Sequence, residues 1–288
     1  MFLPKTLNFY CAVGFILSSL ICQAEEITIT KHEATNRLFY QSKSLFNQMK
    51  KRNSIVADPM LENYLLSIVE KLYPNYIGYF TIYIVRNSAV NAFVFPNGKV
   101  FVTTGLLGIA ENEAQIASVL AHEGAHFVSK HSYLTRNNFI TSVENIVLRG
   151  FDIDEVLSTY SKQIEKDADQ IGLTNYLGVQ YDGNQALYMF KLMSRLKKPN
   201  SDKLKHEYRS HPTIDARIAA IKALIKLKKA SGYENISKNS KDDYQSLTLK
   251  YRLMTYSDFI QKYLYYKLIQ LYEFDPKLPQ MVPEYWFF

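Results

Sequence analysis

The stretch from Ala121 to His126 constrains the fold of this chain more than any other, because residues 122–126 read His-Glu-Gly-Ala-His. Residues four positions apart are neighbours on a helix surface, so a helix here places the rings of His122 and His126 side by side. Glu123 then lies between them. The pattern therefore predicts a helix that presents two imidazoles and a carboxylate in one place.

The neighbouring residues support a buried helix over 113–128. Its apolar positions recur with the 3.6-residue period of a helix, at Ile116, Ala117, Leu120 and Ala121. Asn112 precedes the run as a suitable N-cap. Gly124 costs roughly 1 kcal/mol relative to alanine inside a helix, so we expect another element to pack closely against it. The alternative interpretation is a pair of ordinary core or surface histidines.

The His-Glu-x-x-His pattern is typical of zinc hydrolases, in which the two histidines bind the metal and the glutamate acts on water as a general base. A catalytic zinc needs three protein ligands, so one is missing. The extended pattern with a third histidine fails, because position 132 is serine. His131 follows His126 by five residues and is expected on another part of the helix.

The first 24 residues have the pattern of a signal peptide. Lys5 precedes an apolar run over 9–21, and Cys22-Gln-Ala24 supplies small residues for cleavage after Ala24. The mature chain is then periplasmic or secreted. A lipoprotein acylated at Cys22 and a retained membrane anchor are the alternatives, and both would leave it membrane-associated; the run is short of the about 20 apolar residues of a span.

The cysteine count restricts the chemistry of the mature chain. Both cysteines, Cys11 and Cys22, lie in the leader, so the mature chain has neither a disulfide nor a thiolate metal ligand. The apolar fraction of 47% is that of an ordinary globular protein. A net charge of +7 suits an anionic membrane surface or an acidic partner, although a solvated surface explains it as well. We expect no nucleic-acid partner.

The rest of the sequence predicts an α+β fold that is mainly helical, with a small antiparallel sheet. Residues 25–232 form the main domain, and residues 233–288 form a helical, tyrosine-rich C-terminal appendage after a polar linker. Strands are expected over 79–85, 92–95 and 99–103, with the last hairpin running directly into the 113–128 helix. Other helices are expected over 32–51, 59–72, 135–148, 154–177, 184–197, 213–229 and within 244–274.

A carboxylate is the remaining candidate for the third ligand. Glu165 and Asp169 are four residues apart on a predicted helix, so both point the same way. Glu165 can complete the zinc site, while Asp169 accepts a hydrogen bond from the far nitrogen of His122. A solvated, charged helix face is the alternative interpretation.

Four segments in this order resemble the gluzincin metallopeptidase family that contains the HtpX membrane protease, the CAAX prenyl protease and the BepA-type periplasmic peptidases. They are Asn91-Ala-Phe-Val-Phe-Pro-Asn-Gly, His122-Glu-Gly-Ala-His126, Glu165-Lys-Asp-Ala-Asp169 and Ser210-His-Pro-Thr-Ile-Asp-Ala-Arg217. The resemblance spans roughly residues 58–229 and implies a zincin-type domain of the exported branch.

The resemblance also implies roles for individual residues. One Zn²⁺ would be held by His122, His126 and Glu165. Asn91 and Ala92 would lie on an edge strand that pairs with an extended substrate. His211 and Arg217 would lie near the metal, with His211 donating to the oxyanion of the tetrahedral intermediate.

The motif and the leader predict an exported zinc endopeptidase. The resemblance implies that it acts on unfolded or misassembled envelope polypeptides, with a membrane or an outer-membrane assembly machinery as further partners. One alternative is a chaperone or adaptor whose zinc site is silent or gated, with His211 filling the open metal position. A deformylase-type amidase also uses His-Glu-x-x-His, but normally with a cysteine ligand that the mature chain lacks.

Overall fold

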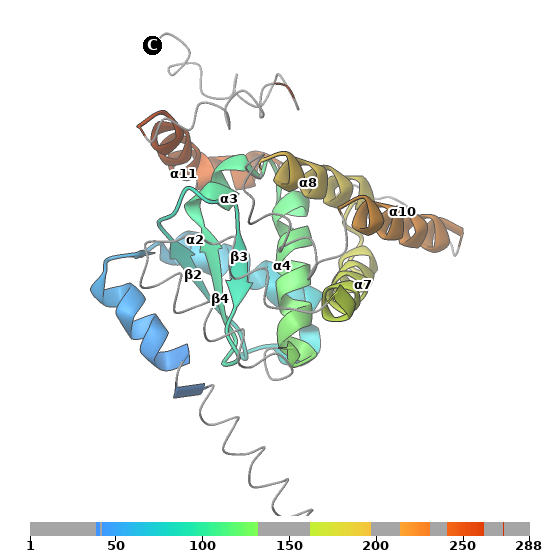
Figure 1. Ribbon diagram of the computed structural model, residues 1–288, viewed down its shortest axis with the longest axis horizontal. Helices are drawn as coiled ribbons and strands as arrows, with labels where there is room; N and C mark the ends of the chain where they lie inside the picture. The colour runs from blue at the N-terminus through green and yellow to red at the C-terminus, as the bar shows by residue number, and fades with distance from the viewer. Residues whose placement is uncertain are drawn as a thin grey trace, which may run out of the picture.

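The computed structural model describes residues 39–40, 42–131, 162–196, 214–230, 241–261 and 273 (Figure 1). The predicted leader, the predicted 135–148 helix and the residues around His211 lie outside these ranges. Residues 42–51 are helical, within the first predicted helix. The fold is mainly helical with one small sheet, which confirms the predicted class. None of the described helices is long and apolar enough to cross a membrane.

The sheet is mixed rather than antiparallel, so this detail of the prediction is wrong. Its strands lie in the order β1 (Ile55–Val56), β2 (Thr81–Val85), β4 (Lys99–Thr103) and β3 (Ala92–Val94). β3 and β4 form the expected antiparallel hairpin, but β4 inserts between β3 and β2. β4 therefore runs parallel to β2, with Thr81 opposite Lys99 and Val85 opposite Thr103.

Side chains cap the N-terminal ends of α2 (Pro59–Leu72) and α4 (Glu113–Val128), and the cap of α4 is the one that the sequence predicts. In α2, the Asp58 carboxylate accepts a hydrogen bond from Leu61 N at 3.2 Å. In α4, the Asn112 side chain accepts from Gln115 N at 3.0 Å. The hairpin does not run directly into α4, because the short helix α3 (Thr104–Ile109) lies between them.

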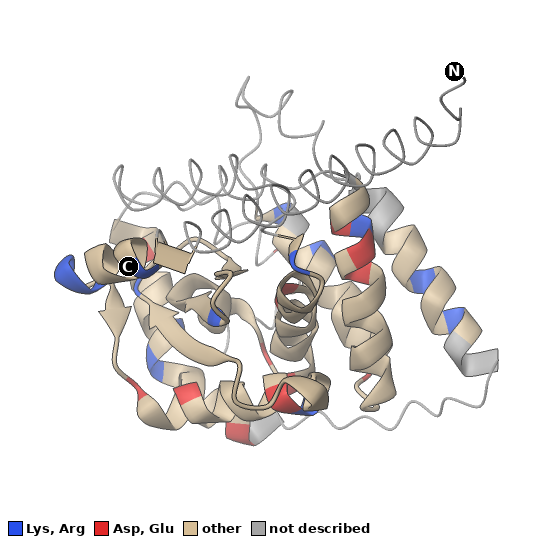
Figure 2. Cartoon of the chain, turned by 90° about the horizontal axis from the view of Figure 1, so that it is seen from below, with Lys and Arg blue, Asp and Glu red and all other residues tan. Residues whose placement is uncertain are grey.

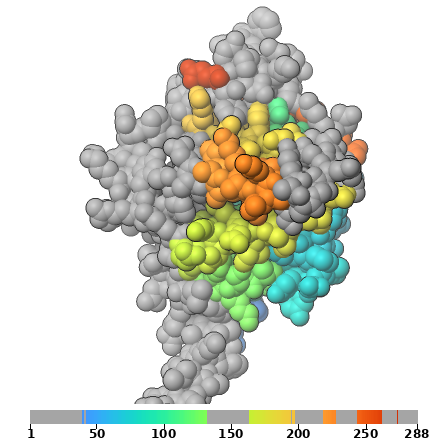
Figure 3. Space-filling model, turned by 90° about the vertical axis from the view of Figure 1, so that its right-hand side faces the viewer, coloured from blue at the N-terminus to red at the C-terminus, as the bar shows by residue number. Residues whose placement is uncertain are grey.

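The remaining described helices pack on α4, the helix of the His-Glu-Gly-Ala-His motif, on each other or on α3. They are α7 (Lys162–Gly178), α8 (Gly183–Arg195), α10 (Ile214–Ala230) and α11 (Lys241–Gln261). α7 and α8 both contact α4, and α10 lies outside them against both (Figures 1 and 3). Acidic residues gather in the first turns of α7, and basic residues lie on α10 (Figure 2).

The N-terminal end of α4 is held by a buried polar cluster. Glu113, the first residue of α4, accepts hydrogen bonds from the hydroxyls of Tyr64, at 2.6 Å, and Tyr181. Lys71 Nζ lies 3.2 Å from the same carboxylate. Burial alone would raise the pKa of Glu113, but these donors lower it, so the group stays charged. The cluster ties α2 and the turn before α8 to the motif helix.

The described part of the predicted appendage packs on the domain rather than standing apart. α11 lies against α3, and Tyr244, Tyr251 and Phe259 of α11 are fully buried in the main hydrophobic core. The Arg252 guanidinium donates to the carbonyl of Ala110 at 2.9 Å, so α11 covers the C-terminal end of α3.

Candidate metal centre

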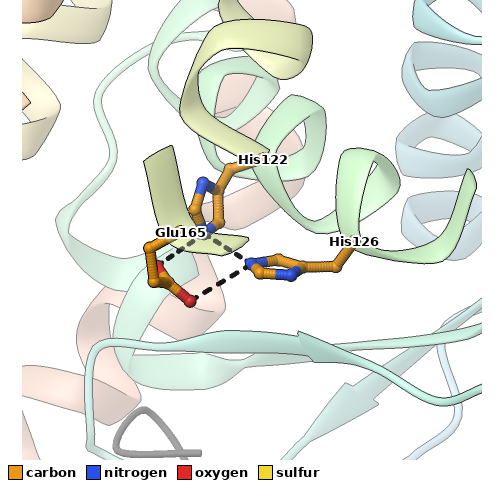
Figure 4. Close-up of side chains that lie close together, drawn as sticks. All are labelled: His122, His126 and Glu165. Atoms are coloured by element: carbon orange, nitrogen blue, oxygen red, sulfur yellow. Dashed lines mark hydrogen bonds and ion pairs between the residues drawn. The ribbon is translucent and has the colours of Figure 1, made fainter. Parts of the chain in front are cut away.

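The two motif histidines face each other on α4. Their Nε2 atoms lie 3.0 Å apart, and the ring planes meet at 79° (Figure 4). The His126 side chain is 2% exposed and that of His122 is 12% exposed. Two nitrogens with converging lone pairs in a site this dry repel each other unless a proton or a cation lies between them.

Glu165 joins the pair from α7, about forty residues further along the chain. Its Oε2 lies 3.5 Å from His122 Nε2, and its Oε1 lies 3.4 Å from His126 Nε2 (Figure 4). The carboxylate is buried, with 3% of the side chain exposed. The structure therefore brings together the three residues that the sequence singled out as ligands, and they are the one group of this kind found among the described residues.

The spacing of these atoms fits a zinc ion. Zinc binds imidazole nitrogen and carboxylate oxygen at about 2.0–2.2 Å, so ligand atoms on a tetrahedral ion lie about 3.3–3.6 Å apart. The two separations that involve Glu165, 3.4 and 3.5 Å, lie in this range, and the His122–His126 separation of 3.0 Å is slightly shorter. Two neutral imidazoles and one carboxylate are also a donor set that zinc accepts, with a fourth position left for water or substrate.

Asp169, one turn after Glu165, lies behind the ring of His122. Its Oδ1 is 2.9 Å from His122 Nδ1. A carboxylate at this nitrogen holds the ring proton there, which leaves Nε2 as the lone-pair nitrogen that points toward Glu165 and His126.

Without a metal, the two rings have opposite protonation tendencies. Burial lowers the pKa of His122, but Asp169 and Glu165 outweigh it and raise that pKa to about 10. Burial lowers the pKa of His126 to about 4, although Glu165 opposes the shift. Near neutral pH the two rings together therefore carry one proton more than two neutral imidazoles do, and a metal ion must displace that proton.

His131 contacts the site, although the sequence analysis placed it on another part of the helix. Its Nδ1 lies 3.0 Å from Nδ1 of His126, and the residue is 4% exposed. The helical spacing failed because α4 ends at Val128 and Lys130 has a left-handed backbone, with φ of 55°. Helical periodicity carries no information on a residue beyond such a turn.

Two glycines let the elements around the site approach each other. A Cβ atom at Gly124 would overlap the ring of Tyr73, whose hydroxyl donates to the Ala121 carbonyl, so the expected close packing is confirmed. A Cβ at Gly172 of α7 would lie 2.7 Å from the Ala121 carbonyl oxygen. α7 can therefore lie near the α4 backbone, which brings Glu165 within reach of the histidines.

The predicted substrate strand lies at the edge of the described sheet. Asn91 and Ala92 are 3% and 1% exposed, and the Asn91 carbonyl accepts from Thr103 N at 3.1 Å. Glu123 is 7% exposed on α4. His211 lies outside the described residues, and Arg217 belongs to α10 without a described side chain. The roles of these residues stay predictions.

Comparison with known proteins identifies the family. Residues 57–225, more than half of the chain, match the model of peptidase family M48. The chain belongs to peptidase family M48. This confirms the resemblance found in the sequence and places the chain among the metallopeptidases, with His122, His126 and Glu165 as a group that could hold the metal.

Relatives of this chain are named as a metalloendopeptidase or as a protease. Mitochondrial metalloendopeptidase OMA1 of Schizosaccharomyces pombe is 32% identical over 124 residues, which cover 39% of this chain and 37% of that protein. The beta-barrel assembly-enhancing protease of Yersinia pestis is 34% identical over 87 residues, 29% of this chain and 18% of that protein. This M48 chain thus matches well under half of either relative.

Proposed function

We propose that this M48 chain is a zinc endopeptidase. The observation that carries the proposal is the convergence of His122, His126 and Glu165 at the spacing of a tetrahedral zinc site, on two packed helices. When bound there, zinc lowers the pKa of water and polarises a carbonyl, which is the chemistry that amide hydrolysis needs.

The protein's own groups divide the remaining work. Glu123 accepts a proton from the attacking water and later passes it to the leaving amine nitrogen, as a general base and then a general acid. Asp169 keeps the His122 ring in the tautomer that ligates through Nε2.

Substrate binding is assigned to β3. Asn91 O and Phe95 N bond inward to Thr103 N and Lys99 O of β4, so by strand alternation the main-chain groups of Ala92 and Val94 face the other way. An extended polypeptide pairing with them would bind through its backbone, with little demand on its sequence. Ala92 and Val94 are only 1% and 2% exposed, so this edge must open before a substrate strand can reach it.

The burial of this edge favours a gated peptidase, in which zinc binding and cleavage are separable. The same observation keeps a second candidate function open, a chaperone or adaptor with a silent site. The two differ in whether unfolded polypeptide is cut at all once the edge is accessible.

The location and substrates follow from weaker observations. Export to the periplasm or the medium rests on the leader pattern over residues 1–24. Action on unfolded or misassembled envelope proteins rests on that pattern and on relatives named beta-barrel assembly-enhancing protease. The other relative described above is named as a mitochondrial protein, so the family does not fix the compartment.

The test compares two glutamate-to-glutamine variants of the chain from Glu25, using unfolded casein as substrate and metal analysis as a second readout. We expect Glu123→Gln to retain one zinc per chain and to lose on the order of 10²–10⁴-fold in cleavage rate. Glu70→Gln, the same chemical change on α2, serves as the matched control and should cleave like the parent. Cleavage by a zinc-loaded Glu123→Gln variant at the parent rate would overturn the assignment.

A further inference from the structure

The turn that ends α4 returns His131 to the metal centre. The Lys130 amide donates to the carbonyl of Phe127 at 3.0 Å, and the left-handed backbone of Lys130 folds the chain back across the last turn of the helix. His131 is consequently 4% exposed, with its ring edge-on to that of His126 and the centroids 5.0 Å apart.

The contact joins two nitrogens that can share only one proton. Nδ1 of His131 and Nδ1 of His126 are 3.0 Å apart, the distance of a hydrogen bond. The other nitrogen of His126, Nε2, points at His122 and Glu165. If Nε2 offers its lone pair to a metal, Nδ1 of His126 must carry the ring proton. His131 is then the acceptor, with its own proton on Nε2.

We propose that His131 is a positioning residue that holds His126 in the ligating tautomer and orientation. The proposal rests on the proposed zinc site. It implies that the two histidine ligands are held by different kinds of side chain. A carboxylate, Asp169, lies behind His122, and an imidazole, His131, lies behind His126. Ligating histidines generally donate their second ring N–H to such a partner, and loss of the partner typically weakens metal binding 10–100-fold.

Two substitutions of His131 distinguish the effect of its hydrogen-bond acceptor from the effect of the size and shape of its ring. His131→Asn keeps an acceptor, because Oδ1 of asparagine is as far from Cβ along the side chain as Nδ1 of histidine. His131→Phe keeps a planar ring and removes the acceptor. The measurements are the zinc dissociation constant, by competition with a chromophoric chelator, and the unfolding temperature of each metal-free protein.

We expect His131→Phe to bind zinc 10–100-fold more weakly than the parent. His131→Asn should stay within a few-fold of the parent, and the metal-free unfolding temperatures should be similar. Parent-like zinc affinity in His131→Phe would overturn the proposal. An equal loss of affinity in both variants would also do so, because it would assign the effect to the shape of the ring.

A measurement on the parent protein avoids any folding defect of the variants. In zinc-loaded protein with ¹⁵N-labelled histidine, NMR should show His131 as the Nε2–H tautomer and His126 as the Nδ1–H tautomer. A proton on Nδ1 of His131 would contradict the proposed direction of the bond. Because none of these readouts uses cleavage, an inactive peptidase would refute the proposed function while leaving the result for His131 standing.

Discussion

At the scale of single residues, the metal centre combines groups that would destabilise the core individually. Two imidazoles and a carboxylate lie within hydrogen-bond range of one another in a largely dehydrated place. Such groups are tolerated when a shared proton or cation satisfies them together. The raised pKa of His122, about 10, and the lowered pKa of His126, about 4, express this sharing.

This pairing predicts how the stability of the metal-free protein depends on pH. His122 has a folded pKa above its ordinary value near 6.5, so its stabilising contribution is complete below pH 6.5 and is lost as pH rises toward 10. His126 acts in the opposite sense, since its folded pKa is lowered, and it penalises folding as pH falls from 6.5 toward 4. The contribution of the pair should therefore be greatest near pH 6.5.

The measurement is thermal unfolding in the presence of a chelator, for the parent and for His122→Gln. The advantage of the parent should shrink between pH 6.5 and 10, because unfolding then releases the proton that the folded ring retains. Zinc-saturated parent protein is the control, since zinc replaces that proton and higher pH favours its binding. A constant difference between the two chelated proteins would show that His122 does not hold the proton.

At the scale of elements, the site exists because α7 packs close to α4. Glu165, Asp169 and Gly172 recur along one face of α7, and Gly172 lies against the α4 backbone at Ala121 and His122. Removing the close approach should therefore move both carboxylates away from the histidines.

Gly172→Ala tests this packing. A Cβ at this position would lie 2.7 Å from the Ala121 carbonyl oxygen, a backbone atom that cannot move aside freely. We expect a loss of about 1–3 kcal/mol in the free energy of unfolding, as for overpacked cores, and weaker zinc binding. Gly178→Ala near the end of the same helix is the matched control, because a Cβ there meets nothing within 4 Å. If denaturant unfolding showed that both substitutions lower the free energy of unfolding equally, close packing at Gly172 would not be what holds α7 against α4.

Local sequence signals predicted the parts of the fold that local forces decide. Asn112 marks a helix start that the structure confirms, and the i, i+4 spacing placed Glu165 and Asp169 on one side of α7. The parallel pairing of β2 with β4 escaped prediction, because it joins strands distant in sequence and leaves no local pattern. His131 escaped because one left-handed residue, Lys130, ended the helical periodicity.

At the scale of the whole molecule, the C-terminal helix and the metallopeptidase domain share one core. Asp58 shows the connection, because Oδ1 of its carboxylate caps α2 while Oδ2 accepts from the Tyr251 hydroxyl of α11 at 2.8 Å. The Thr255 hydroxyl of α11 is fully buried and donates to the Thr104 carbonyl at the start of α3, at 2.8 Å. We therefore expect α11 to unfold together with the domain.

Replacing Thr255 by valine should measure this coupling. The change keeps the shape of the side chain and removes the bond to Thr104, and a buried hydrogen bond of this kind contributes about 0.5–1.5 kcal/mol to the free energy of unfolding. Thr248→Val is the matched control, because its equally buried hydroxyl donates to Tyr244 O within α11 and bonds to no other element in the part of the chain that the structure describes. In denaturant unfolding, Thr255→Val should be the more destabilising change, within a single transition. A separate early transition, or equal effects of both variants, would mean that α11 is not part of the cooperative unit that holds the metal centre.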